Sequence, residues 1–222
     1  MTSSQPRLRS NILWTVSPPV LRAIGKAFFS FRIEYEEAPP PAPYVIAANH
    51  YSHFDPPMIA SGLDRPVRFL ALEDLFTESR LLNWLITGYG AIPTPRHRLP
   101  IAAVRAALDA LESREVIGVF PEATRVSHWG TLPPKRGAAW LAVRAGVPLT
   151  PVAVVGTGQA FGLDNRITRA PIRLVVGRAL SPESGVDALM EAWSEWMSGT
   201  IRRFPDSQVS GPPRSEWDGH QG

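Results

Sequence analysis

The stretch IAAVRAALDALESREVIGVFPEATR, residues 101–125, decides the fold class. Its first half places apolar residues every three or four positions with charged residues between them, which predicts an amphipathic helix over Ile101–Arg114. Its second half is the continuous apolar run Val116–Phe120, typical of a buried strand, and the run ends at Pro121. A helix followed at once by a buried strand is the repeating unit of an α/β fold.

The same alternation continues in both directions along the chain. Further strands are predicted at Tyr44–Ala48, Val67–Leu70, Ala91–Ile92, Leu149–Val155 and Ile172–Val176. Further helices are predicted at Leu75–Ile86, Arg136–Ala145 (closed by Gly146) and Asp187–Arg203. We therefore expect an α/β fold with a mostly parallel central sheet flanked by helices, and a functional site at the strand ends.

Composition excludes several classes of function. The 222 residues suit one domain, and the absence of cysteine excludes disulfides, thiolate metal sites and thiol nucleophiles. A net charge of +3 is too small to favour nucleic acid as a partner. The longest uncharged stretch, Ala145–Leu163, is too rich in proline and glycine for a membrane-spanning helix, and we expect no signal peptide.

The first 33 residues contain five basic residues and no acidic residue. After Ser17-Pro18-Pro19, which we interpret as a helix start, apolar residues follow helical spacing within an arc of about 120°, opposite Arg22 and Lys26. These apolar residues are Val20, Leu21, Ile24, Ala27, Phe28 and Phe31. The pattern favours an amphipathic helix lying in a lipid interface. The alternative is a helix packed on the domain's own core, with its basic residues in solvent.

His50 and Asp55 stand five residues apart, directly after the strand predicted at Tyr44–Ala48. A carboxylate that folds back onto one imidazole nitrogen leaves the other nitrogen basic, which is the arrangement that general-base catalysis requires. One alternative is a histidine with a purely structural role in the loop. Another is a metallohydrolase site formed by His50, His53 and Asp55, but their spacing is not that of a binuclear zinc site, so we predict no metal.

Further candidate residues follow other predicted strands. Glu122 and Arg125 lie just after Phe120, where the arginine would bind an anionic group and the glutamate would accept from a hydroxyl or hold the arginine. Arg96 follows the short strand at Ile92, and Lys135 and Arg136 begin a helix. Each could simply be solvated or form a surface ion pair. Together they indicate a hydroxyl to be deprotonated close to a bound phosphate.

The order of these motifs resembles the glycerolipid acyltransferase family, typified by the 1-acyl-glycerol-3-phosphate (lysophosphatidic acid) acyltransferases. Four sequence blocks of that family are matched in order within about residues 44–156. The matching residues are Asn49, His50 and Asp55 in the first block, Ile92, Pro93 and Arg96 in the second, Phe120, Pro121, Glu122, Thr124 and Arg125 in the third, and Val147, Pro148, Leu149, Pro151 and Val152 in the fourth.

The resemblance implies transfer of an acyl chain from acyl-CoA or acyl-carrier protein to the hydroxyl of a lysophospholipid, with no metal, other cofactor or covalent intermediate. His50 would be the general base and Asp55 its orienting partner. The acceptor's glycerol phosphate would be held by Arg96, Glu122, Thr124 and Arg125. A non-catalytic lipid-binding domain with the same fold is the main alternative.

The expected organisation has three parts: a membrane-docking helical segment at 1–37, an acyltransferase domain at 38–204 and a loose tail at 205–222. The protein would bind lipids peripherally, on the cytoplasmic face of the cell membrane. This chain departs from the family blocks at Ala123 (usually Gly), Val126 (usually Ser) and Pro95 (usually acidic). If position 123 requires a positive φ, alanine costs about 1–2 kcal/mol there.

Overall fold

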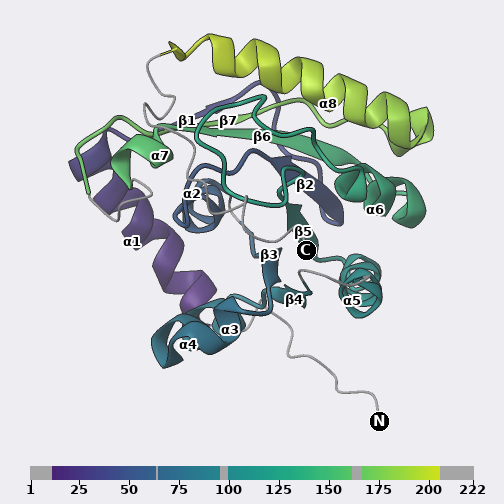
Figure 1. Ribbon diagram of the computed structural model, residues 1–222, viewed down its shortest axis with the longest axis horizontal. Helices are drawn as coiled ribbons and strands as arrows, with labels where there is room; N and C mark the ends of the chain where they lie inside the picture. The colour runs from purple at the N-terminus through teal and green to yellow at the C-terminus, as the bar shows by residue number, and fades with distance from the viewer. Residues whose placement is uncertain (1–11, 64, 96–99, 162–166, 206–222) are drawn as a thin grey trace, which may run out of the picture.

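The computed structural model describes residues 12–63, 65–95, 100–161 and 167–205. A seven-stranded sheet lies at its centre, in the order β1-β7-β6-β2-β5-β3-β4 (Figure 1). The strands are β1 (Arg32–Tyr35), β2 (Tyr44–Ala48), β3 (Val67–Leu72), β4 (Ile92–Thr94), β5 (Val116–Val119), β6 (Leu149–Val155) and β7 (Arg173–Val176). Five neighbours, β6 to β4, run parallel, and β7 is antiparallel to β6. The predicted α/β fold with a mostly parallel sheet is confirmed.

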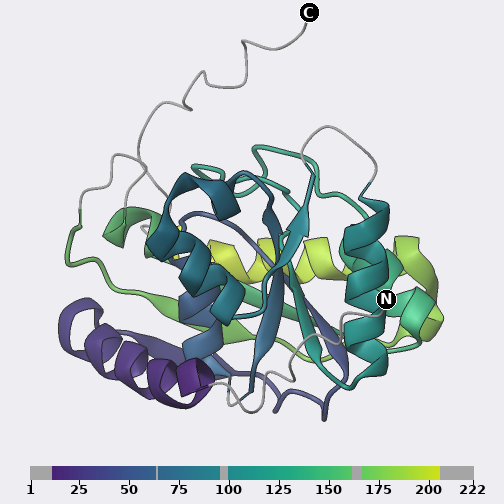
Figure 2. The ribbon, with the colours of Figure 1, turned by 90° about the horizontal axis from the view of Figure 1, so that it is seen from below.

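Helices cover both faces of the sheet. One face carries α5 (Ile101–Glu112), α6 (Gly137–Ala145) and α8 (Gly185–Arg202), and the other carries α1 (Ile12–Phe29) and α2 (Asp55–Gly62). Two short helices, α3 (Leu75–Glu78) and α4 (Arg80–Gly88), connect β3 to β4, and α7 (Thr157–Ala160) and the 3-10 turn η2 (Pro182–Ser184) complete the set among the described residues. In both ribbon views α1 and α5 lie on opposite sides of the sheet (Figures 1 and 2).

The central strand β2 is buried along its whole length because a strand and a layer of helices lie on each side of it. Val45 and Ala47 face the core beneath α5, α6 and α8, whereas Tyr44, Ile46 and Ala48 face the core beneath α1 and α2. A strand buried on both faces has no polar face, which explains its continuous apolar sequence.

The N-terminal helix differs from the prediction in where it begins. It starts at Ile12, so Pro18 and Pro19 lie inside it and do not mark its start. Tertiary packing stabilises the first turns, because Leu13 contacts Gly88 and the ring of Trp14 meets that of Tyr89 edge-on at 5.0 Å. Phe31 lies beyond the helix end, buried in the core, so it does not belong to the lipid-facing arc.

Arg22 also differs from its predicted place in solvent. Its Nε and Nη2 donate hydrogen bonds to the carbonyl oxygen of Ser61, at 2.9 and 2.6 Å, and so join α1 to the last turn of α2. Helix α1 therefore combines the two alternatives: one side packs on the domain, and the other remains exposed.

Other elements also differ from the sequence prediction. Strand β1, helices α2 and α7 and the turn η2 are not among the predicted elements. The helix predicted at Leu75–Ile86 is two helices that meet at the extended residue Ser79. Pro56 and Pro57 obscured α2, although proline is well tolerated in a first helical turn, where the amide lacks an intrahelical partner. Ser79 caps α4 by accepting from the Leu82 amide at 3.1 Å.

Candidate active site

The carboxyl ends of β2 and β5 lie side by side and carry the residues of the candidate site. Asn49 directly follows β2, and its buried side chain both donates to the carbonyl oxygen of Val154 at 2.7 Å and accepts from the Val154 amide at 2.8 Å. This paired contact with β6 fixes the chain just before His50. The sequence block that contains Asn49 is therefore partly structural.

His50 and Asp55 form the predicted pair. His50 Nδ1 lies 2.8 Å from Asp55 Oδ2, and Asp55 is fully buried at the start of α2. The same carboxylate oxygen accepts from the amides of Tyr51 and Ser52, at 2.6 and 2.8 Å. Main-chain donors and the helix N-terminus stabilise a negative charge on Asp55. With Nδ1 bound to that carboxylate, Nε2 is the ring nitrogen available as a base.

A stack of aromatic rings supports the face of the His50 imidazole. Phe120 lies 4.1 Å from it, with the rings inclined by 15°, and Phe69 stacks behind Phe120 at 5.3 Å. Gly118 makes room for this stack, because a Cβ at that position would lie 2.4 Å from the Phe69 ring. Sequence analysis assigned no role to Phe120 or Phe69; the only signal was that Phe120 belongs to the third block.

Glu122 lies in the same place but faces the protein interior. It is 4% exposed, and its Oε2 accepts from the backbone amide of His50 at 2.6 Å. Its Oε1 is buried and has no hydrogen-bond partner among the described residues. Burial, together with the nearby Asp55 carboxylate, raises the pKa of Glu122 to about 8 even though the His50 hydrogen bond opposes the rise. This position differs from that expected of an acceptor ligand.

The loop after Phe120 also carries the half-buried Thr124 and Arg125. It is bonded to the segment that carries His50, because the Val126 amide donates to the His50 carbonyl oxygen at 2.9 Å. Partial burial and the positive charge of Arg125 lower the pKa of His53, which places Arg125 near the His50–Asp55 segment. Thr124 and Arg125 are thus on the same edge of the sheet as His50.

The remaining predicted ligands are less closely associated with His50. Lys135 is exposed, and its amide donates to the Pro121 carbonyl oxygen at 2.7 Å, so it borders the same loop. Arg136 is exposed and forms an ion pair with Asp187 of α8. Arg96 lies outside the described residues, and so do positions 206–222 of the tail predicted at 205–222.

Ala123, where the related blocks have glycine, has a φ of +59°. It is the fourth residue of the turn that begins at Phe120, and its amide closes the turn by donating to the Phe120 carbonyl oxygen at 2.9 Å. The left-handed conformation expected for a glycine is therefore retained by alanine, at a cost in backbone strain.

Within the described residues, no three or more His, Asp or Glu side chains converge in a group that could hold a metal ion. The metallohydrolase alternative based on His50, His53 and Asp55 therefore has no geometric support from these positions. In the part of the chain described, no helix has the length and apolar character needed to cross a bilayer.

Comparison with known proteins identifies the family of this chain. A family model described as Acyltransferase matches residues 30–155, which is more than half of the chain. A 1-acyl-sn-glycerol-3-phosphate acyltransferase of Chlamydomonas reinhardtii is 30% identical over 171 residues, 75% of this chain and 51% of that protein. The alpha form from Mus musculus is 33% identical over 165 residues, 72% of this chain and 58% of its own length. The chain thus spans little more than half the length of these relatives.

A solved structure shares the fold. The 1-acyl-sn-glycerophosphate (LPA) acyltransferase PlsC from Thermotoga maritima superposes with a TM-score of 0.66 and 20% sequence identity. The alignment covers 90% of this chain and 98% of that one. The likeness in fold therefore extends over most of this chain.

Proposed function

Because this chain belongs to the acyltransferase family, we propose that it transfers a fatty acyl chain from a thioester donor, acyl-CoA or acyl-carrier protein, to the hydroxyl of a lysophospholipid. The first candidate acceptor is 1-acyl-glycerol-3-phosphate, the substrate in the names of its relatives, and the product would be phosphatidic acid. The observation that carries the proposal is the 2.8 Å contact between His50 Nδ1 and the buried carboxylate of Asp55.

The chemistry would need only side chains of this protein. His50 Nε2 takes the proton of the acceptor hydroxyl while the oxygen attacks the thioester carbonyl carbon, and Asp55 stabilises the resulting imidazolium. The new C–O ester bond forms, the C–S bond breaks, and the imidazolium returns the proton to the departing thiolate. No cofactor enters this sequence.

Cationic residues around His50 would hold the acceptor phosphate. Arg125 and Thr124 lie in the loop that is bonded to the His50 main chain, and Lys135 borders that loop. Arg96 belongs to the same proposed site by its sequence block. Arg136 would take part only by exchanging Asp187 for the phosphate. Guanidinium groups suit this task because their paired N–H donors match phosphate oxygens.

The exposed side of α1 supports docking on a membrane surface. Ile12, Val16, Val20, Ile24 and Phe28 repeat every fourth residue and are between 46% and 74% exposed. Helix α1 contains no acidic residue, and its Lys26 is exposed. An exposed apolar row on a helix whose charged residues are all basic fits an anionic lipid interface.

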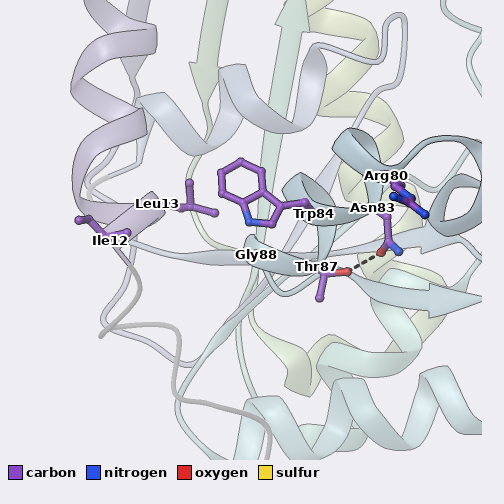
Figure 3. Close-up of a pocket in the computed structure, with 7 residues that line it drawn as sticks. All are labelled: Ile12, Leu13, Arg80, Asn83, Trp84, Thr87 and Gly88. Carbon is purple, nitrogen blue, oxygen red and sulfur yellow. Dashed lines mark hydrogen bonds between the residues drawn. The ribbon is translucent and has the colours of Figure 1, made fainter.

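This apolar surface continues onto α4. Trp84 and Leu81 are 58% and 68% exposed, and a cleft of about 540 Å³ lies between α4 and the start of α1. In Figure 3, Ile12 and Leu13 of α1 and Trp84 of α4 line this cleft, with Arg80 at its far end. Tryptophan favours the membrane–water interface, so α4 would form a second contact with the lipid.

Vesicle binding tests the docking surface. The double variant Val20→Asp/Ile24→Asp should lose most of its sedimentation with vesicles containing phosphatidylglycerol, because it places two charges in the apolar row. The matched control is Ile101→Asp, which changes an exposed isoleucine at the start of α5, on the opposite side of the sheet. Equal losses in both proteins, or none in either, would contradict docking through α1.

A direct assay tests the activity. The purified chain should incorporate a radiolabelled acyl group from acyl-CoA or acyl-carrier protein into a panel of lysophospholipids, and the panel identifies the acceptor and the donor. Absence of product with every acceptor and both donors would overturn the proposal in favour of a non-catalytic lipid-binding domain. Loss of an observed activity on addition of a chelator would indicate metal-dependent chemistry instead.

A further inference from the structure

We infer that Glu122 is a positioning residue for His50, which holds the main chain of the general base and does not bind the acceptor. This inference rests on the proposed acyl transfer, because it concerns how the proposed general base of that reaction is held in position. It assigns a different task to the one acidic residue of the third sequence block.

The carboxylate of Glu122 links two strand ends. Glu122 follows β5, His50 follows β2, and the 2.6 Å hydrogen bond from the His50 amide to Glu122 Oε2 joins them. The next contact on the same loop is the Val126 amide, which donates to the His50 carbonyl oxygen at 2.9 Å. Both main-chain polar groups of His50 are therefore held by the segment 122–126.

The two carboxyl groups around His50 have complementary tasks. Asp55 fixes the ring through Nδ1, whereas Glu122 fixes the peptide group from which the side chain extends. Because both backbone and ring are held, Nε2 has little freedom to move away from the bound acceptor. The burial of Glu122, at 4% exposure, leaves little of its carboxyl available to a substrate hydroxyl.

A neutral side chain suits this task better than a charged one. Glu122 lies near the Asp55 carboxylate and the buried phenol of Tyr51, so a second negative charge would be unfavourable there. The burial that raises its pKa to about 8 keeps a proton on Glu122 at neutral pH. Glutamine matches that neutral form in shape and charge, and its side-chain oxygen can still accept from the His50 amide.

The test compares steady-state kinetics of three variants with a lysophospholipid acceptor that the wild-type protein uses. Glu122→Ala should lower kcat by about 10- to 100-fold with little change in KM for the acceptor. Glu122→Gln should restore kcat to within about threefold of wild type. Arg125→Ala, the matched loop variant, should instead raise KM for a phosphorylated acceptor.

The opposite pattern would overturn the inference: a raised acceptor KM with unchanged kcat in Glu122→Ala, or no rescue by glutamine. If Glu122→Ala does not fold, Glu122→Asp withdraws the carboxyl from the His50 amide by one methylene and should show the same loss of kcat. The ¹H–¹⁵N resonance of the His50 amide should shift in both Ala and Asp variants. Failure of the proposed function is distinct, because the wild-type protein would then give no product.

Discussion

At the scale of single residues, three contacts fix the position of His50, two to its ring and one to its backbone. Asp55 binds its ring nitrogen, Glu122 binds its amide, and Phe120 covers its face. A stacked ring restricts rotation about the side-chain bonds without taking up either nitrogen. The position of Nε2 therefore depends in part on Phe120, whose ring has no acidic, basic or nucleophilic group.

Removal of the Phe120 ring should slow acyl transfer. Stacked aromatic pairs contribute about 0.5–1.5 kcal/mol, and a loss of this size in the transition state lowers the rate by about 2- to 10-fold. We expect Phe120→Leu, which retains apolar volume but not the ring, to lower kcat by that amount and the melting temperature by only a few degrees. An unchanged kcat would show that the stack has no part in positioning His50.

Ala123→Gly should stabilise the protein by about 1 kcal/mol, because glycine adopts a φ of +59° without the Cβ clash. Urea denaturation measures the change. The control is Ala102→Gly on the exposed side of α5, where glycine should destabilise by about 1 kcal/mol through its backbone entropy. Destabilisation at both positions would contradict strain at Ala123.

The titration of Glu122 should appear in the pH dependence of stability. Burial raises its pKa from 4.5 to about 8, so the folded protein binds a proton that the unfolded chain releases in this range. The contribution of Glu122 to the free energy of unfolding is therefore fully present below the lower pKa and is lost as pH rises towards the upper one. Glu122→Gln should lack this loss, so its stability relative to wild type should increase between about pH 5 and pH 8. A constant difference across that range would contradict the assigned pKa.

At the scale of helices and strands, elements with strong local signals could be predicted from the sequence. Helix α5 has regular apolar spacing, and β2 and β6 are continuous apolar runs, so their predicted positions agree with the structure to within two residues. The start of α1, helix α2 and strand β1 depend on contacts with distant parts of the chain. Leu13 against Gly88 is one such contact, and no local spacing encodes it.

Some contacts in the candidate site could also be predicted from the sequence, and others could not. The His50–Asp55 contact could be predicted because both residues lie in one short segment, where the fold brings their side chains together. The contacts of His50 with Glu122 and Phe120 span two strands, so only the sheet register reveals them. Residue types left two roles open for Glu122, accepting from a hydroxyl or holding Arg125, and the family resemblance implied a place at the acceptor; its burial and its bond to the His50 amide could not be predicted from either.

The stability of the protein should depend on Asn49, because its side chain links the end of β2 to β6. Asn49→Ala removes both partners of the Val154 peptide contacts, and a buried unsatisfied group costs about 1–3 kcal/mol. We expect a loss of at least about 2 kcal/mol in the free energy of unfolding. Asn83→Ala on exposed α4 should change it by less than about 0.5 kcal/mol. Similar small effects of both substitutions would show that Asn49 is not needed to join the strands.

At the scale of the whole molecule, α2 connects the proposed membrane surface to the carboxylate of Asp55. Asp55 begins this helix, and Ser61 near its end accepts hydrogen bonds from Arg22 of α1. The apolar row on the outside of α1 is thus joined through one short helix to the partner of His50. This link gives the proposed membrane surface a fixed position relative to the proposed general base.

The most direct measurement is the rate of acyl transfer by His50→Ala with saturating donor and lysophospholipid. We expect a folded protein, with a melting temperature near that of wild type, whose kcat is lower by a factor of about 10² to 10⁴. A folded His50→Ala protein with the turnover of wild type would contradict general-base catalysis by His50.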